Sequence, residues 1–203
     1  MPVWLKRLNV GLKPLPKDGS VFCGVYSPEA RCGKTSLAKA IGVNNKGSIY
    51  FGFEDFGIRD NLGEEILYHI KVKSNKVLEL IDRVPFNEHG FIEIRGILTY
   101  MDIRQLDQDN MAWLKEQLLM VGNYSRVIFD VGVGALSDLN ILKVMDRVYV
   151  PTLAEDSTRL QAFRQLLRCR EYVDLNSRIM YMTVPVCHYT SDIMMDFVNK
   201  GEL

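Results

Sequence analysis

The sequence predicts an α/β fold: a mostly parallel β-sheet with helices on both faces. Short apolar runs rich in β-branched and aromatic residues alternate with longer segments of helical periodicity, which is the pattern of a parallel sheet. The short runs are apolar almost throughout, as expected of strands that are buried on both faces. The first of them leads directly into a tight loop and a helix.

Length and composition fit one soluble globular domain with a sizeable core. The chain has 203 residues, 47% of them hydrophobic and 25% charged. We expect the domain to occupy residues 21–203, after a lead-in segment over residues 1–20. Twenty-five basic residues balance twenty-five acidic ones, so the net charge does not favour nucleic acid as a direct partner.

Two further features of the sequence favour a cytoplasmic protein. Its four cysteines, Cys23, Cys32, Cys169 and Cys187, lack C-x-x-C spacing, which indicates reduced thiols rather than a disulfide framework or a zinc site. No stretch of the sequence has the roughly 20 apolar residues of a membrane span.

The segment Val21–Ala40 predicts a phosphate-binding loop between a strand and a helix. Gly33 would let the backbone approach a phosphate closely, Lys34 would reach the β- and γ-phosphates, and the Thr35 hydroxyl would bind magnesium. Backbone N–H groups at the start of the helix would add to the attraction for an anion. The candidate nucleotide-binding residues of this loop are Glu29, Ala30, Arg31, Cys32, Gly33, Lys34, Thr35 and Ser36.

The match to the phosphate-loop pattern is incomplete. G-x-x-x-x-G-K-[ST] requires glycine at position 28, where this chain has Pro28. The remaining G-K-T tripeptide also fits an ordinary helix N-terminus. The strand before it and the helix after it favour the phosphate loop.

The next strand and helix are predicted at residues 47–53 and 63–72. The strand ends at an acidic pair, Glu54 and Asp55, where open α/β sheets bind their ligands. Residues 73–107 are harder to interpret: residues 77–81 have helical spacing, whereas residues 91–98 alternate like a strand with one exposed face. Asp107 is predicted to cap a helix that runs through Leu119.

A second acidic strand end is predicted at Asp130, after the apolar run that begins at Arg126. A carboxylate at the end of a strand beside the phosphate loop can hold the water shell of magnesium, and Gly134 would let the following loop move toward a γ-phosphate. The alternative is a strand that ends in a turn-forming Asp-Val-Gly. Beyond this point we expect helices at 136–145, 155–173 and 193–198 and strands at 147–151 and 178–184.

Four segments together resemble the MinD/ParA branch of the P-loop ATPases, the deviant Walker A or SIMIBI class, and within it the TadZ/CpaE-like proteins of pilus assembly loci. They are S-P-E-A-R-C-G-K-T-S, Y-F-G-F-E-D-F-G-I-R-D-N-L, V-I-F-D-V-G-V-G and D-R-V-Y-V-P-T-L-A-E-D-S. The resemblance covers residues 21–186 in order and is weakest over residues 73–117.

The resemblance implies an ATP-dependent switch that forms a homodimer, hydrolyses ATP slowly and positions or assembles a larger apparatus. Lys34, Asp55 and Asp130 would be its catalytic residues, with Glu54 as the nearest rival of Asp55. Thr35 and Asp130 would hold Mg2+, partly through water, and Pro185 would lie beside the adenine. The protein would be recruited to a pole or to a membrane-associated complex and would bind proteins of a pilus or secretion apparatus.

One departure from the family is expected to matter most. The signature lysine that precedes the two glycines of the loop is replaced by Glu29, and the glycines by Ala30 and Arg31. A carboxylate near a triphosphate is repelled by it, whereas Arg31 could supply the missing cation. The departures favour a second hypothesis, a non-catalytic scaffold of the same fold. A third, a relative of the tyrosine kinases of polysaccharide export, would require a tyrosine-rich tail, which is not evident near Leu203.

Overall fold

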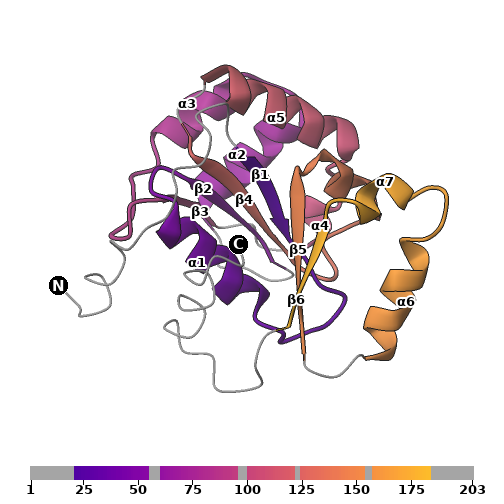
Figure 1. Cartoon of the computed structure of the whole chain (residues 1–203). Helices are drawn as coiled ribbons and strands as arrows, with labels where there is room; N and C mark the ends of the chain where they lie inside the picture. Colours follow the sequence, from indigo (N-terminus) through magenta and orange to yellow (C-terminus); the bar gives the residue numbers. More distant parts are fainter. Residues whose placement is uncertain (1–20, 55–59, 96–99, 122–123, 154–156, 184–203) are drawn as a thin grey trace, which may run out of the picture.

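The computed structural model describes residues 21–54, 60–95, 100–121, 124–153 and 157–183. Its centre is a six-stranded sheet in which all paired strands are parallel, in the order β3-β2-β4-β1-β5-β6 (Figure 1). The strands are β1 (Val21–Val25), β2 (Ile49–Phe53), β3 (Ile92–Ile94), β4 (Arg126–Val131), β5 (Arg147–Thr152) and β6 (Ile179–Thr183). The predicted lead-in over residues 1–20 and helix over residues 193–198 lie outside the described residues.

Helices cover both faces of the sheet, as predicted (Figure 1). One face packs against α1 (Lys34–Asn44), whose Leu37 and Ile41 are buried among strand side chains that include Tyr50 and Tyr149. The opposite face carries the larger core, where Phe51 and Phe129 stack with ring centroids 4.9 Å apart. That core includes α2 (Asn61–Lys71), α3 (Lys76–Asp82), α5 (Gln108–Val121) and α6 (Thr158–Leu166).

The middle of the chain resolves into short elements. The helical spacing at 77–81 corresponds to α3, and the cap predicted at Asp107 is confirmed, because its Oδ1 accepts a hydrogen bond from the backbone N–H of Asn110 at 2.7 Å. Helix α4 (Tyr100–Ile103) precedes α5. Of the strand expected over 91–98, Ile92–Ile94 form β3, which lies at the edge of the sheet and pairs with β2, whereas residues 96–98 lie outside the described residues.

Two predicted helices are wrong in extent. The helix expected over 136–145 is a shorter 3₁₀ helix, η2 (Leu139–Val144). It begins after its cap, Asp138, and its buried residues recur at the three-residue spacing of a 3₁₀ helix, Leu139 with Leu142 and Ile141 with Val144. The helix expected over 155–173 is two helices, α6 and α7 (Val173–Asn176). The buried stripe of Leu160, Phe163 and Leu167 has no apolar successor at Arg170 or Glu171, and the chain turns there.

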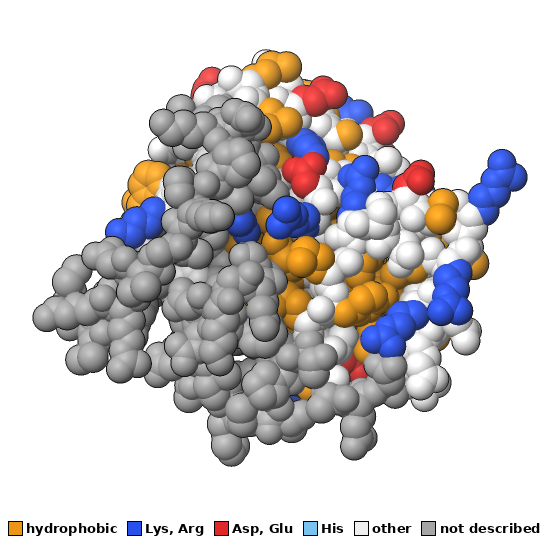
Figure 2. Space-filling view, in the orientation of Figure 1, with side chains coloured by type: hydrophobic (Ala, Val, Ile, Leu, Met, Phe, Trp, Pro, Cys, Tyr) orange, Lys and Arg blue, Asp and Glu red, His pale blue; other side chains and the backbone are white. Residues whose placement is uncertain are grey.

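Positive charge is distributed unevenly although the net charge is zero. Helix α6 and the turn after it carry Arg159, Arg164, Arg168 and Arg170. Figure 2 shows blue side chains on the side of the molecule where Figure 1 places α6 and α7. Helix α6 lies on the β6 side of the sheet, away from β2 and β3 (Figure 1).

Candidate phosphate-binding and acidic site

The predicted phosphate loop connects β1 to α1, and α1 begins at Lys34. The residue before the helix, Gly33, has a φ of 84°, in the left-handed region that glycine adopts without strain. Its carbonyl accepts the first helical hydrogen bond, from the N–H of Leu37 at 2.9 Å. Arg31 also has a positive φ, 58°, which is unusual for a residue with a side chain. The loop therefore makes two left-handed steps just before the helix.

Buried polar contacts fix the first half of the loop. The hydroxyl of Ser27, which is fully buried, accepts a hydrogen bond from the N–H of Glu29 at 3.2 Å. The Glu29 side chain turns toward the end of β5, where Oε2 accepts from the N–H of Leu153 at 3.3 Å. The Cys32 thiol is buried and donates to the carbonyl of Glu29 at 3.4 Å. Ala30 and Arg31 are exposed between these anchored residues.

Lys34 is the first residue of α1, and its side chain bends back over the loop. Its ammonium donates a hydrogen bond to the backbone carbonyl of Glu29 at 2.9 Å. The ammonium therefore lies over the loop that precedes it, the place where the phosphate-loop pattern puts its lysine.

The sheet brings the two acidic strand ends to this loop. Strand β4 lies between β1 and β2, and Asp130 is paired in register with Val25 of β1 and with Gly52 of β2. Glu54 directly follows the last residue of β2. Because all three strands are parallel, their carboxyl ends share one edge of the sheet with the start of α1.

Four side chains meet at this edge: those of Thr35, Tyr50, Glu54 and Asp130. The Tyr50 hydroxyl donates to Asp130 Oδ2 at 2.9 Å and lies 3.5 Å from Glu54 Oε1. The Thr35 hydroxyl lies 3.5 Å from the same Glu54 oxygen. The acidic strand ends are thereby connected to the first turn of α1.

Asp130 is the most buried carboxylate of the group, with 1% of its surface exposed. Burial raises its pKa to about 6, because removal from water disfavours the charged form. Hydrogen bonds from Thr35 and Tyr50 favour the carboxylate and act in the opposite direction, while repulsion by Glu54 adds to the effect of burial. Asp130 is thus held in a polar but poorly hydrated position.

The donor set suits magnesium better than a transition metal. A hydroxyl and two carboxylates are hard oxygen ligands, and no histidine or cysteine thiol lies among these contacts. No group of three or more His, Cys, Asp or Glu side chains able to hold a metal occurs in the described residues. Magnesium sites in proteins use one or two carboxylates, and phosphate and water oxygens complete the octahedron.

The structure brings together several residues that the sequence singles out. Lys34, Thr35 and Asp130 lie at one sheet edge, just after Gly33, and Glu54 lies among them. Asp55 and Pro185 lie outside the described residues. The sequence pattern does not reveal Tyr50, because it stands there as one apolar residue of a buried strand. Its signal was the two-residue period of β2, which places Tyr50, Gly52 and Glu54 on one face.

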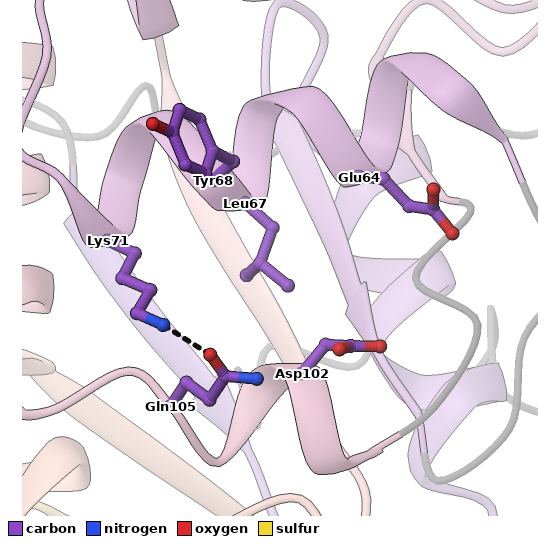
Figure 3. A pocket seen from close by; sticks show the side chains of 6 residues that line it. All are labelled: Glu64, Leu67, Tyr68, Lys71, Asp102 and Gln105. Carbon is purple, nitrogen blue, oxygen red and sulfur yellow. Dashed lines mark hydrogen bonds between the residues drawn. The ribbon is translucent and has the colours of Figure 1, made fainter.

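Two cavities lie outside this group. One, of about 290 Å³, is lined by residues of α2 and the α4 region, including Leu67, Lys71 and Asp102 (Figure 3). The other, of about 430 Å³, is a mostly apolar groove between the phosphate loop and α6, with Pro28 and Phe163 in its wall. Neither is lined by Lys34, Thr35 or Asp130.

Comparison with known structures identifies the fold. No protein-family model and no curated protein sequence matches the chain. Cobyrinic acid a,c-diamide synthase from Mycobacterium smegmatis, with bound ATP analogue and magnesium, is 16% identical with a TM-score of 0.57, over 89% of this chain and 82% of that one. The septum site-determining protein MinD from Pyrococcus horikoshii, complexed with Mg-ADP, is 12% identical with a TM-score of 0.52, over 80% and 68%.

A third similar structure has a different activity. The kinase domain of the Escherichia coli tyrosine kinase ETK is 18% identical with a TM-score of 0.57, over 87% of this chain and 71% of that one. A shared sheet at such low identity is evidence of fold and not of reaction. The chain therefore has the α/β fold of the MinD/ParA-like P-loop NTPases, with its phosphate-loop sequence between the first strand and the first helix of the sheet.

Proposed function

We propose that this protein binds ATP and Mg2+ and is a slowly hydrolysing, MinD/ParA-like ATPase that dimerises on nucleotide. One observation carries the proposal: the loop that ends in Gly33, Lys34 and Thr35 lies at the same sheet edge as Asp130 and Glu54. Similar folds crystallised with an ATP analogue or ADP and magnesium support it.

Each residue of the site would have its own role in nucleotide binding and hydrolysis. Backbone N–H groups at the start of α1 and the Lys34 ammonium attract phosphate oxygens. Thr35 and Asp130 hold the metal, Asp130 partly through water. Glu54, or its neighbour Asp55, orients the attacking water. Bound Mg2+ would neutralise charge on the β- and γ-phosphates.

The cellular role is proposed from the family resemblance. A nucleotide-dependent homodimer would position or assemble a larger apparatus, in the manner of TadZ/CpaE-like proteins of pilus or secretion systems. The protein would act in the cytoplasm and be recruited to a pole or to a membrane-associated complex. No helix in the described part of the chain is long and apolar enough to cross a membrane.

Calorimetric titration of the protein with ATP tests the proposal, first with magnesium and then with EDTA. We expect saturable binding at one site per chain that weakens when magnesium is removed. Size-exclusion chromatography with light scattering should then show a dimer with ATP and magnesium and a monomer without them. Absence of any heat of binding, together with an unchanged melting temperature in saturating ATP, would contradict it.

A second candidate is a scaffold that keeps the fold and has lost hydrolysis. Glu29 supports it, because this carboxylate stands where relatives carry the signature lysine and is engaged with the backbone of Leu153. The two candidates differ in one measurement: both bind nucleotide or dimerise, but only the ATPase releases inorganic phosphate. A wild-type rate that equals that of Lys34→Ala would favour the scaffold.

A further inference from the structure

We infer that Tyr50 is a positioning residue for the metal side of this site: its hydroxyl orients the Asp130 carboxylate and separates it from Glu54. The inference rests on the proposed function, because it assigns a role to Tyr50 through the residue that would hold Mg2+. It concerns a side chain of β2 that the phosphate-loop pattern does not include.

The contacts of the Tyr50 hydroxyl carry this inference. It donates to Asp130 Oδ2 at 2.9 Å, an ordinary length for a hydrogen bond between a hydroxyl and a carboxylate, and lies 3.5 Å from Glu54 Oε1. Tyr50 is 1% exposed and Asp130 also 1%, so water cannot readily replace this contact. A hydrogen bond to a charged group in such surroundings is stronger than one in water.

The rest of the Tyr50 side chain is held by packing. Its ring lies 6.4 Å from the ring of Phe91 in an edge-to-face arrangement and belongs to the core cluster beneath α1. Lys39 of α1 places its ammonium 5.9 Å from the ring centroid. The hydroxyl is therefore carried by a ring with little freedom, and its direction is set before any ligand binds.

Gly52 provides the space that Tyr50 uses. The two residues are on the same face of β2, and Gly52 is paired in register with Asp130. A Cβ atom at Gly52 would lie 3.3 Å from Tyr50 Cε1 and 3.5 Å from its hydroxyl. A side chain at this position would press on the Tyr50 ring and shift it slightly from its place beside the acidic strand ends.

The consequence for metal binding follows from geometry. A carboxylate that can rotate must lose that freedom when it binds a metal or its water, and an oriented one has already lost it. The phenol holds Oδ2 of Asp130 and so fixes the direction of the whole carboxylate group. The phenol is neutral, and it lies between the carboxylates of Asp130 and Glu54, which would otherwise repel each other directly. Removal of the hydroxyl should therefore weaken metal binding while leaving the phosphate contacts intact.

The test compares wild type with Tyr50→Phe, which keeps the ring and removes the hydroxyl. Mn2+ serves as the probe, and its binding to the ADP-saturated protein is followed by electron paramagnetic resonance. ADP affinity is measured separately in EDTA by calorimetry. We expect the dissociation constant for Mn2+ to rise about tenfold, as for other residues that orient a metal ligand, with ADP affinity in EDTA unchanged.

Tyr149→Phe is the matched control. Tyr149 is a fully buried tyrosine of the same core cluster, on β5, and among the described residues its hydroxyl makes no hydrogen bond to Asp130 or Glu54. Its removal should leave both affinities unchanged. An Asp130→Asn background adds a second control: there the Tyr50→Phe change should no longer affect Mn2+ binding, whereas a merely structural role would persist.

The possible outcomes separate the inference from the function on which it rests. A change in Mn2+ affinity smaller than about threefold in Tyr50→Phe would overturn the inference. If that variant does not fold, Gly52→Ala, which displaces the ring and keeps the hydroxyl, should raise the Mn2+ dissociation constant instead, and an unchanged constant there would overturn it equally. If wild-type protein binds no ADP under either condition, the proposed function fails and the inference fails with it.

Discussion

The side-chain ammonium of Lys34 donates a hydrogen bond to the backbone carbonyl of Glu29, 2.9 Å away. The Glu29 carboxylate in turn accepts from the N–H of Leu153 at the end of β5. The predicted phosphate loop is thereby attached at one side to the first turn of α1 and at the other to the neighbouring strand. Lys34, which matches the family pattern, is therefore bonded directly to Glu29, which stands where that pattern has its signature lysine.

Lys34→Ala is expected to abolish nucleotide binding at little cost to the fold. The contact with Glu29 is one partly buried hydrogen bond, so the free energy of unfolding should fall by only about 1 kcal/mol. In wild type, ATP with magnesium at a hundred times its dissociation constant should stabilise the protein by about 2.7 kcal/mol. Thermal unfolding with and without ATP should show this stabilisation in wild type and none in the variant.

Lys46→Ala is the control for that experiment, because Lys46 is an exposed lysine just after α1 and takes no part in the described contacts of the loop or of Tyr50. It should keep the full thermal shift. A Lys34→Ala protein that is stabilised by ATP as much as wild type would contradict the assignment of the loop.

Glu29→Ala should destabilise the protein even without nucleotide. Glu29 is 5% exposed, and its loss leaves the N–H of Leu153 without its side-chain acceptor. Hydrogen bonds to charged groups contribute roughly 1.5–3 kcal/mol, so the free energy of unfolding in urea should fall by about that amount. Glu29→Gln keeps an acceptor oxygen and should recover most of the loss. Equal stability of the alanine variant and wild type would show that the contact is energetically neutral.

Arg31→Ala should remove nucleotide-dependent dimerisation and leave the fold intact, if Arg31 supplies the cation that Glu29 no longer does. Arg31 is exposed, and the alanine variant keeps a side chain at a φ of 58°. Arg31→Gly relieves that backbone conformation and should be the more stable of the two variants by about 0.5–1 kcal/mol.

Light scattering with ATP and magnesium measures the dimer formed by the Arg31 variants. Arg83→Ala, an exposed arginine after α3, is the control and should dimerise normally; a dimer in the Arg31 variants would refute this role.

Stability should depend on pH through Asp130. Its pKa is raised by burial from 3.8 to about 6, so between these values the folded chain binds more protons than the unfolded chain. The free energy of unfolding therefore falls as pH rises from about 4 to about 6, by about 1.4 kcal/mol for each pKa unit between the two states. Urea unfolding at several pH values should show this decline in wild type and a flatter profile in Asp130→Asn. Parallel profiles for the two proteins would contradict the raised pKa.

The sequence by itself determined the main strands, the parallel sheet and the place of the strand, loop and helix that carry the phosphate-loop pattern. Apolar runs such as Ile49–Phe53 and Arg126–Val131 are buried on both faces, so their composition alone identifies them. The loop was identifiable because Gly33, Lys34 and Thr35 stand at a fixed place between strand and helix. In each case the information is local: it depends on neighbouring residues and not on what packs against them.

Tertiary structure decided which distant groups meet. Strand β4 lies between β1 and β2 although it follows them by many residues, and this order alone brings Asp130 beside Gly52 and under the Tyr50 hydroxyl. Tertiary structure also places the Glu29 side chain against Leu153, and the segment expected to be one helix over 155–173 contains the two helices α6 and α7. Such contacts depend on the register of neighbouring strands and on which side chains fill the space between them, and neither is encoded in any short stretch of the chain.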